Sequence, residues 1–189
     1  MALAGAALGS ASCGDTSLGR SPSILVIDDL TGAQGNNPGS FGGNLQSDVA
    51  TKGSIYEDLG QVTMHVEIKD LGNPGADSSP SQLNQVTVNR YHVEFKRADG
   101  RNTQGVDVPY AFDGAMTMTV GTSLKFSSFT LVRIQAKLEP PLRALVNQGG
   151  KLAISTIAEV TFYGQDLAGN PVYAVGSIGI NFADWADPS

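Results

Sequence analysis

The sequence predicts an all-β protein, an antiparallel two-sheet sandwich of seven or eight strands. Apolar and polar residues alternate over many short segments, which is the period of a strand with one face on a core. The 23 glycines and 9 prolines favour turns between those segments. Residues 140–147 are the one stretch that indicates a helix, a turn or two that starts at a proline pair and ends before Gly149.

The first strand is predicted at residues 23–28, a compact apolar run that we expect to pair within its own chain, with strand exchange between subunits as the alternative. Residues 29–60 predict a long irregular loop, because Gly, Asn, Ser and Pro are dense there. Residues 1–22 predict a leader followed by a tether. The remainder, residues 23–189, has the length of a single β-sandwich domain.

The clearest strand lies at residues 61–69 and places four apolar side chains on one face: Val62, Met64, Val66 and Ile68. In the next strand, the apolar parity changes between Val88 and Tyr91. One extra residue, at Asn89 or Arg90, would restore a common face, so the sequence predicts a β-bulge there.

Three further segments predict strands before the helical turn. Residues 106–112 predict a short edge segment, because Pro109 cannot donate to a β-ladder. Residues 115–120 predict a strand with three apolar side chains inward: Met116, Met118 and Val120. Residues 124–136 predict a strand that alternates through Leu124, Phe126, Val132 and Ile134.

The last third of the chain, residues 151–182, predicts two alternating strands joined by a turn. Asp166 can accept hydrogen bonds from its own turn backbone, Gly169 can take a positive φ, and Asn170 completes the turn. This hairpin resembles the closing hairpin of bacterial immunoglobulin-like and fibronectin-III-like domains, with Tyr163 similar to their corner aromatic. The resemblance implies a sandwich fold; such domains serve as adhesins, spacers, enzyme appendages and receptors.

The N-terminus contains the single cysteine, Cys13, behind an apolar run of small residues. This arrangement resembles the tail of a bacterial lipoprotein signal, with Ala11 and Ser12 before the cysteine that is acylated. The resemblance implies export, lipidation at Cys13 and a tether to a membrane surface of the cell envelope. A cleaved or frayed leader and a buried thiol are the alternatives. A lone cysteine excludes an internal disulfide and a Cys-rich zinc site.

Charge and motifs narrow the function classes. The net charge of −6 argues against a nucleic-acid partner, which would need a basic stripe. No nucleophile elbow, phosphate loop or dinucleotide motif occurs, so we do not expect an enzyme. His65 and His92 lie on the polar parity of their strands and are expected at the surface. We expect a monomer without a required cofactor.

Two residue groups could bind a ligand. Carboxylates around the 29–60 region could hold Ca²⁺, or could be solvated acidic turns; they are Asp28, Asp29, Asp48, Glu57 and Asp58. Aromatic rings could form a platform for a sugar ring; they are Tyr56, Tyr110, Tyr163, Tyr173 and Trp185. For Trp185, the alternative is a plug that packs over the end of the sandwich.

The leading hypothesis is an exported, lipid-anchored β-sandwich with a binding or structural role at the cell envelope, and a polysaccharide or an envelope protein as its partner. A carbohydrate-binding module is the second hypothesis. It requires at least two exposed rings in one plane. An enzyme with a site assembled from loops is the third, and it requires carboxylates that converge with His65 or His92 in a cleft.

Overall fold

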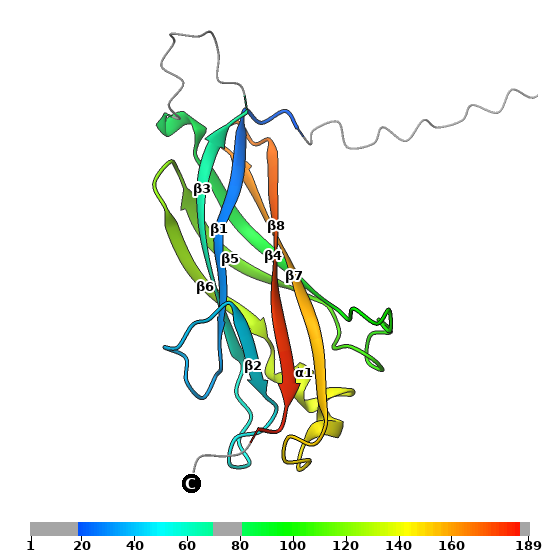
Figure 1. Cartoon of the computed structure of the whole chain (residues 1–189). Coiled ribbons are helices and arrows are strands. Elements are labelled where there is room, and N and C mark those ends of the chain that lie inside the picture. Colours follow the sequence, from blue (N-terminus) through cyan, green and yellow to red (C-terminus); the bar gives the residue numbers. More distant parts are fainter. Residues whose placement is uncertain (1–18, 70–80, 186–189) are drawn as a thin grey trace, which may run out of the picture.

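The computed structural model describes residues 19–69 and 81–185. This part of the chain is all-β, with two sheets and a single short α-helix (Figure 1). The eight strands are β1 (Ser23–Ala33), β2 (Asn44–Asp48), β3 (Asp58–Ile68), β4 (Val86–Lys96), β5 (Phe112–Val120), β6 (Lys125–Val132), β7 (Ala153–Asp166) and β8 (Pro171–Ala183). None of its helices is long and apolar enough to cross a membrane.

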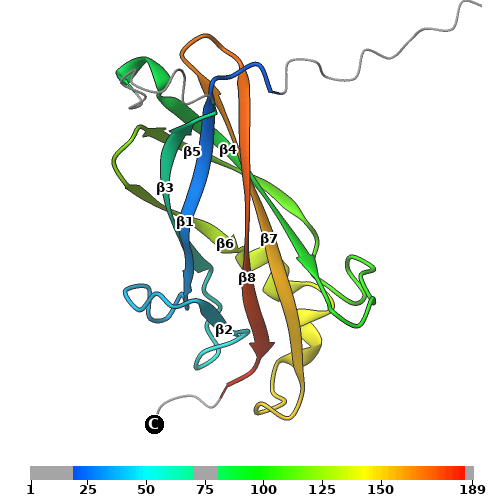
Figure 2. The same ribbon diagram turned by 45° about the horizontal axis from the view of Figure 1, so that its top comes forward.

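A three-stranded sheet in the order β1-β3-β6 faces a five-stranded sheet in the order β2-β8-β7-β4-β5. The larger sheet is curled like half of a barrel, and β7 and β8 run along most of the elongated molecule (Figure 2). All strand pairs are antiparallel except β2 with β8, which is parallel. The expectation of purely antiparallel sheets is therefore wrong at this edge, because the chain leaves the small sheet after β1 and joins the large one.

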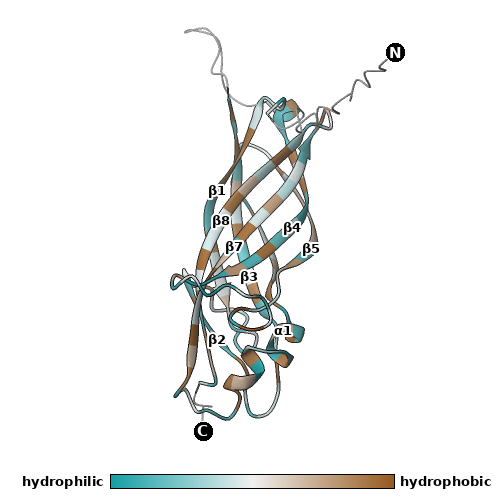
Figure 3. Ribbon diagram, turned by 90° about the vertical axis from the view of Figure 1, so that its right-hand side faces the viewer, coloured by the Kyte–Doolittle hydropathy of each residue, from teal (hydrophilic) through white to brown (hydrophobic). Residues whose placement is uncertain are grey.

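Apolar side chains from both sheets meet in one core. Tyr91, Phe129 and Phe162 form its aromatic centre, with ring centroids 4.9 Å apart for Tyr91–Phe129 and 5.4 Å for Phe129–Phe162. Edge-on packing at these distances adds about 0.5–1.5 kcal/mol per pair beyond area burial. Figure 3 shows the hydrophobic and hydrophilic residues alternating along the strands.

The 29–60 region is more regular than expected. It contains the end of β1, all of β2 and the start of β3, instead of one long loop. Its glycines explain the difference, since a Cβ at Gly60 would lie 2.5 Å from the Phe129 ring and one at Gly32 would lie 3.2 Å from Leu131. These glycines are strand residues that admit large neighbours, although glycine in sequence indicates a turn.

The strand expected at 124–136 is shorter, and of its four expected inward residues only Val132 is buried. Leu124 and Phe126 are 62% and 73% exposed, whereas Phe129 and Leu131 are buried. The chain then forms α1 (Ile134–Leu138), a helix that the sequence did not predict. The helical turn expected near 140–147 is present as a 3-10 helix, η2 (Leu142–Leu145), and a second 3-10 helix, η1 (Gln82–Asn84), precedes β4.

The predicted bulge in β4 is confirmed. Its pairing shifts register between Val88 and Arg90 on both sides, toward β5 and toward β7. The inward side chains before and after the bulge, Val88 and Tyr91, are both buried. The irregularity places Asn89 and Arg90 on the exposed side of the sheet, where the candidate site lies.

Candidate functional site

The outer surface of β7 and β8 carries two tyrosines side by side. Tyr163 and Tyr173 are directly opposite each other in the antiparallel ladder. Side chains at such positions share one face of the sheet, with Cβ atoms about 4.5–5.5 Å apart. Tyr173 is 54% exposed, and Tyr163 is partly exposed. Two of the five aromatic residues that the sequence offered as a ligand platform are thus brought together.

Arg90 joins these tyrosines from the bulge of β4. Its guanidinium carbon lies 4.2 Å from the centroid of the Tyr163 ring, and Tyr163 pairs with Arg90 in the β4–β7 ladder. A cation over an aromatic face at a surface contributes about 0.5–1 kcal/mol. On its other side, Arg90 Nη1 is 3.4 Å from Asp113 Oδ1 on β5. The guanidinium is therefore held between the ring and a carboxylate.

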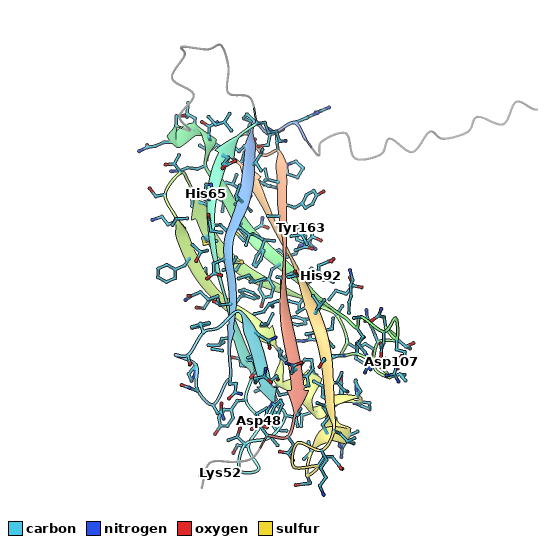
Figure 4. The ribbon with its side chains drawn as sticks, in the orientation of Figure 1. Asp48, Lys52, His65, His92, Asp107 and Tyr163 are labelled. Carbon is cyan, nitrogen blue, oxygen red and sulfur yellow. The ribbon has the colours of Figure 1, made fainter. Side chains whose placement is uncertain are left out.

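Together these residues border a groove with a volume of about 610 Å³. This volume is typical of small-ligand sites. We call it the tyrosine groove; its lining residues are Asn89, Arg90, Thr161, Tyr163, Gly164, Gln165, Pro171, Val172, Tyr173 and Val175. A smaller depression of about 100 Å³ shares Pro171, Val172 and Tyr173 with it, so that Tyr173 borders both hollows. Tyr163 is labelled on this part of the molecule in Figure 4.

The turn between β7 and β8 fixes one end of the groove. Asp166 Oδ1 accepts hydrogen bonds from the backbone N–H of Ala168 at 2.9 Å and of Asn170 at 2.8 Å, and Oδ2 accepts one from Asn170 Nδ2 at 2.9 Å. Gly169 has φ +81°. Although burial acts to raise it, hydrogen bonds to the charged form, led by those from Asn170, lower the Asp166 pKa. The carboxylate therefore organises the turn, in the manner that the sequence motif predicts.

A second polar cluster lies inside the opposite end of the molecule, around α1. The buried Lys137 Nζ is 2.9 Å from Asp58 Oδ1 and donates to the backbone oxygen of Asp48 at 2.8 Å. Asp58 also accepts from Ser47 Oγ at 2.5 Å and from the Gly35 N–H at 3.0 Å. Burial raises the pKa of Asp58 while Lys137 acts to lower it. We interpret this cluster as structural, since every carboxylate oxygen has a donor.

The carboxylates offered as Ca²⁺ ligands are divided among different partners. Asp58 is neutralised by Lys137, and Asp48 accepts from Thr51 Oγ1 at 2.6 Å. Asp28 pairs with a histidine, Asp29 is exposed on β1, and Glu57 accepts from Thr130 Oγ1 at 3.3 Å. Within residues 19–69 and 81–185, no three His, Cys, Asp or Glu side chains form a group that could hold a metal ion. The five carboxylates offered for Ca²⁺ thus do not form one group in this part of the chain, and a bound Ca²⁺ stays a prediction.

The two histidines lie on different sheets, His65 on β3 and His92 on β4, and both side chains are partly exposed (Figure 4). His65 Nδ1 is 2.7 Å from Asp28 Oδ2, and its Nε2 is 3.3 Å from Glu67 Oε1. The Asp28 hydrogen bond, supported by Glu67, raises the pKa of His65. His92 Nδ1 is 3.3 Å from Asp113 Oδ1. Neither histidine lines the tyrosine groove.

The other three aromatic candidates lie elsewhere. Tyr56 borders a separate hollow with Pro38 and Ile134. Tyr110 packs over Gly105, where an added Cβ would lie 2.3 Å from the phenolic oxygen. Trp185 donates its backbone N–H to Asp48 Oδ1 at 3.1 Å, next to the Lys137 cluster. The five residues therefore do not form one platform, because they come from strands and loops at different ends of the molecule.

Cys13 lies outside the described residues. Arg90 was not among the ligand residues chosen from the sequence. The signal that could have found it was the predicted bulge, because a bulge redirects the side chains around it.

No family model matches the chain, and no curated protein matches it. One solved structure, described as "X-ray structure of Northeast Structural Genomics Consortium target SoR45", aligns with 86% of this chain and 86% of its own. The identity is 12% and the TM-score is 0.33. This likeness is too weak to bear on fold or function.

Proposed function

We propose that the chain is an exported, lipid-anchored binding protein of the bacterial cell envelope, which binds a polysaccharide in the tyrosine groove. The observation that carries the proposal is the pairing of Tyr163 with Tyr173 on the exposed face of β7 and β8. Flat rings can stack on the apolar faces of pyranose sugars, and neighbouring amide and hydroxyl groups can bind the sugar hydroxyls. Asn89, Thr161 and Gln165 supply such groups within the groove.

The strand order supports an immunoglobulin-like sandwich for this protein. In that fold, strands A, B and E share one sheet, and strands C, F and G share the other, with C′ beside C in some members. Here β1, β3 and β6 take the places of A, B and E, while β8, β7, β4 and β5 take those of G, F, C and C′. The groove then lies on the outer face of the sheet that contains the last hairpin.

The proposed anchor would keep the domain close to a membrane. Cys13 stands six positions before Gly19, the first described residue. A chain of that length spans at most about 20 Å. Gly19 borders the depression beside Tyr173, so an acylated Cys13 would keep the binding face near the envelope surface. The test is metabolic labelling with a radioactive fatty acid, with Cys13→Ala as the control; no label on the unaltered protein would contradict the anchor.

The binding proposal is tested by affinity electrophoresis in gels that contain a panel of neutral and acidic polysaccharides. We expect retardation by at least one of them, and an affinity about two- to tenfold weaker for Tyr173→Ala, since an aromatic contact contributes about 0.5–1.5 kcal/mol. Tyr110→Ala is the matched control, because Tyr110 is similarly exposed but outside the groove. Absence of retardation by every polymer, or equal losses for both variants, would refute the proposal.

A further inference from the structure

We propose that the ligand of the tyrosine groove is an acidic polysaccharide, with a uronic acid carboxylate bound by Arg90. This inference rests on the proposed function and deepens it. It names the class of sugar and the residue that selects it.

The charge of the groove differs from that of the whole chain. The protein has 18 acidic and 12 basic residues and a net charge of −6. Among the described residues that line the groove, however, Arg90 is the only charged one. Beyond Tyr173, the smaller depression adds Lys69 and again no carboxylate among its lining residues. Cations therefore lie on both sides of the exposed Tyr173 ring. This arrangement of positive charge is complementary to a polymer that carries negative charge.

Arg90 retains the capacity to bind a carboxylate. A guanidinium has five N–H donors in a planar fork that matches the two oxygens of a carboxylate. Only Nη1 contacts Asp113, at a long 3.4 Å, and the Arg90 side chain is 53% exposed. The Tyr163 ring holds the guanidinium 4.2 Å from its centroid, which limits the freedom of the fork. A ligand carboxylate would thus compete with one weak, solvent-exposed contact.

The rest of the groove suits the sugar ring that carries the carboxylate. Tyr173 offers an exposed aromatic face, and Val175 extends the apolar surface along the same strand. Asn89 and Gln165 lie on β4 and β7 and can each donate and accept hydrogen bonds. Arg90 would contact the carboxylate of a bound sugar residue and Tyr173 would contact its ring, and the two contacts together would orient that sugar residue.

The experiment compares two polymers with the same sugar backbone, polygalacturonate and its fully methyl-esterified form, which differ in charge and in one methyl group per sugar residue. Affinity of the full-length chain is measured by titration calorimetry at low salt, with oligomers of defined length. We expect at least about tenfold tighter binding of the acidic oligomer, as a charge-assisted hydrogen bond is worth about 1.5–3 kcal/mol. Arg90→Gln should remove this preference, and higher salt should weaken it.

Arg143→Gln is the matched control, because Arg143 is exposed on η2, away from the groove, and its substitution changes the net charge equally. If both oligomers bind equally well and Arg90→Gln has no effect, this inference fails and the proposed function stands. If neither oligomer nor any other glycan binds, the proposed function fails as well. Vesicles with phosphatidylglycerol form a further arm, and Arg90-dependent binding to them alone would assign the groove to a lipid surface and overturn the polysaccharide.

Discussion

Replacement of Lys137 by methionine tests the interpretation of the buried cluster around α1. The ammonium and the Asp58 carboxylate are each 1% exposed and 2.9 Å apart. Methionine fills a similar volume but leaves Asp58 with only Ser47 and the Gly35 N–H as donors. Removing one partner of a buried ion pair costs about 3–5 kcal/mol, since the remaining charge is desolvated without compensation. For a chain of this size, that loss lowers Tm by roughly 6–20 °C.

The assay is urea unfolding at pH 7 and at pH 4.5, with the exposed Lys151→Met as the control. The folded-state pKa of Asp58 lies above its usual value of 3.8 because of burial. Without Lys137, which acts to lower it, that pKa rises further. A raised pKa means that the folded state keeps its proton to higher pH than the unfolded state. The contribution of Asp58 is therefore greatest at low pH and is lost as pH rises through the folded-state pKa.

The Lys137→Met loss should accordingly be smaller at pH 4.5 than at pH 7. The double variant Asp58→Leu with Lys137→Met should be more stable than the sum of the two single losses predicts, because it removes both charges together. A loss below about 1 kcal/mol at pH 7, within reach of ordinary surface substitutions, would refute the assignment of Lys137 as the buried partner of Asp58.

Two further predictions concern His65 and Asp166. Asp28 raises the pKa of His65 in the folded state. The contribution of protonated His65 to the free energy of unfolding is therefore fully present below pH 6.5, and it is lost as pH rises through the folded-state pKa of His65. NMR titration should give a pKa above 6.5, and His65→Gln should flatten the pH dependence of stability; a pKa at or below 6.5 would contradict the Asp28 contact. Asp166→Ala should cost about 1–3 kcal/mol in urea unfolding, because it leaves the N–H groups of Ala168 and Asn170 without their acceptor. Asp166→Asn, which keeps one acceptor oxygen, should cost less, and equal losses would mean that the turn does not depend on these bonds.

The parts of the fold that follow local rules could be predicted from the sequence. The hairpin at residues 151–182 and the bulge near Arg90 both follow from the period of a strand. The inward faces of β3 and β5 follow in the same way, with Met64 and Met118 buried. These elements are long or strongly alternating, so the alternation of apolar and polar residues identifies their buried face.

Other parts depend on contacts that the pattern does not contain. In β6, Phe126 is exposed and Phe129 is buried, so the aromatic residues alone give the wrong phase. Lys137 is buried on a five-residue helix, while lysine in sequence indicates a solvated position. The strand β2 could not be predicted from the sequence, because it is stabilised by pairing with β8, which is far away in the chain.

The candidate site shows the same division. Its two tyrosines were among the aromatic residues that the sequence singled out, but only the register of β7 with β8 places Tyr163 opposite Tyr173. Arg90 reaches the same surface through a third strand, β4. The turn at residues 166–170 fixes the register of β7 with β8, whereas the register that brings Arg90 of β4 beside Tyr163 joins strands far apart in the sequence and cannot be predicted from a local pattern.

The most direct test is an NMR titration of the ¹⁵N-labelled protein with a galacturonate oligomer, in which each backbone amide is followed separately. We predict that the largest chemical-shift changes occur at Asn89, Arg90, Gln165 and Tyr173, around the tyrosine groove. Amides near Tyr56 and Trp185 should remain unchanged. Shifts that gather around those two residues, or no shifts at millimolar oligomer, would contradict the assignment of the groove as the binding site.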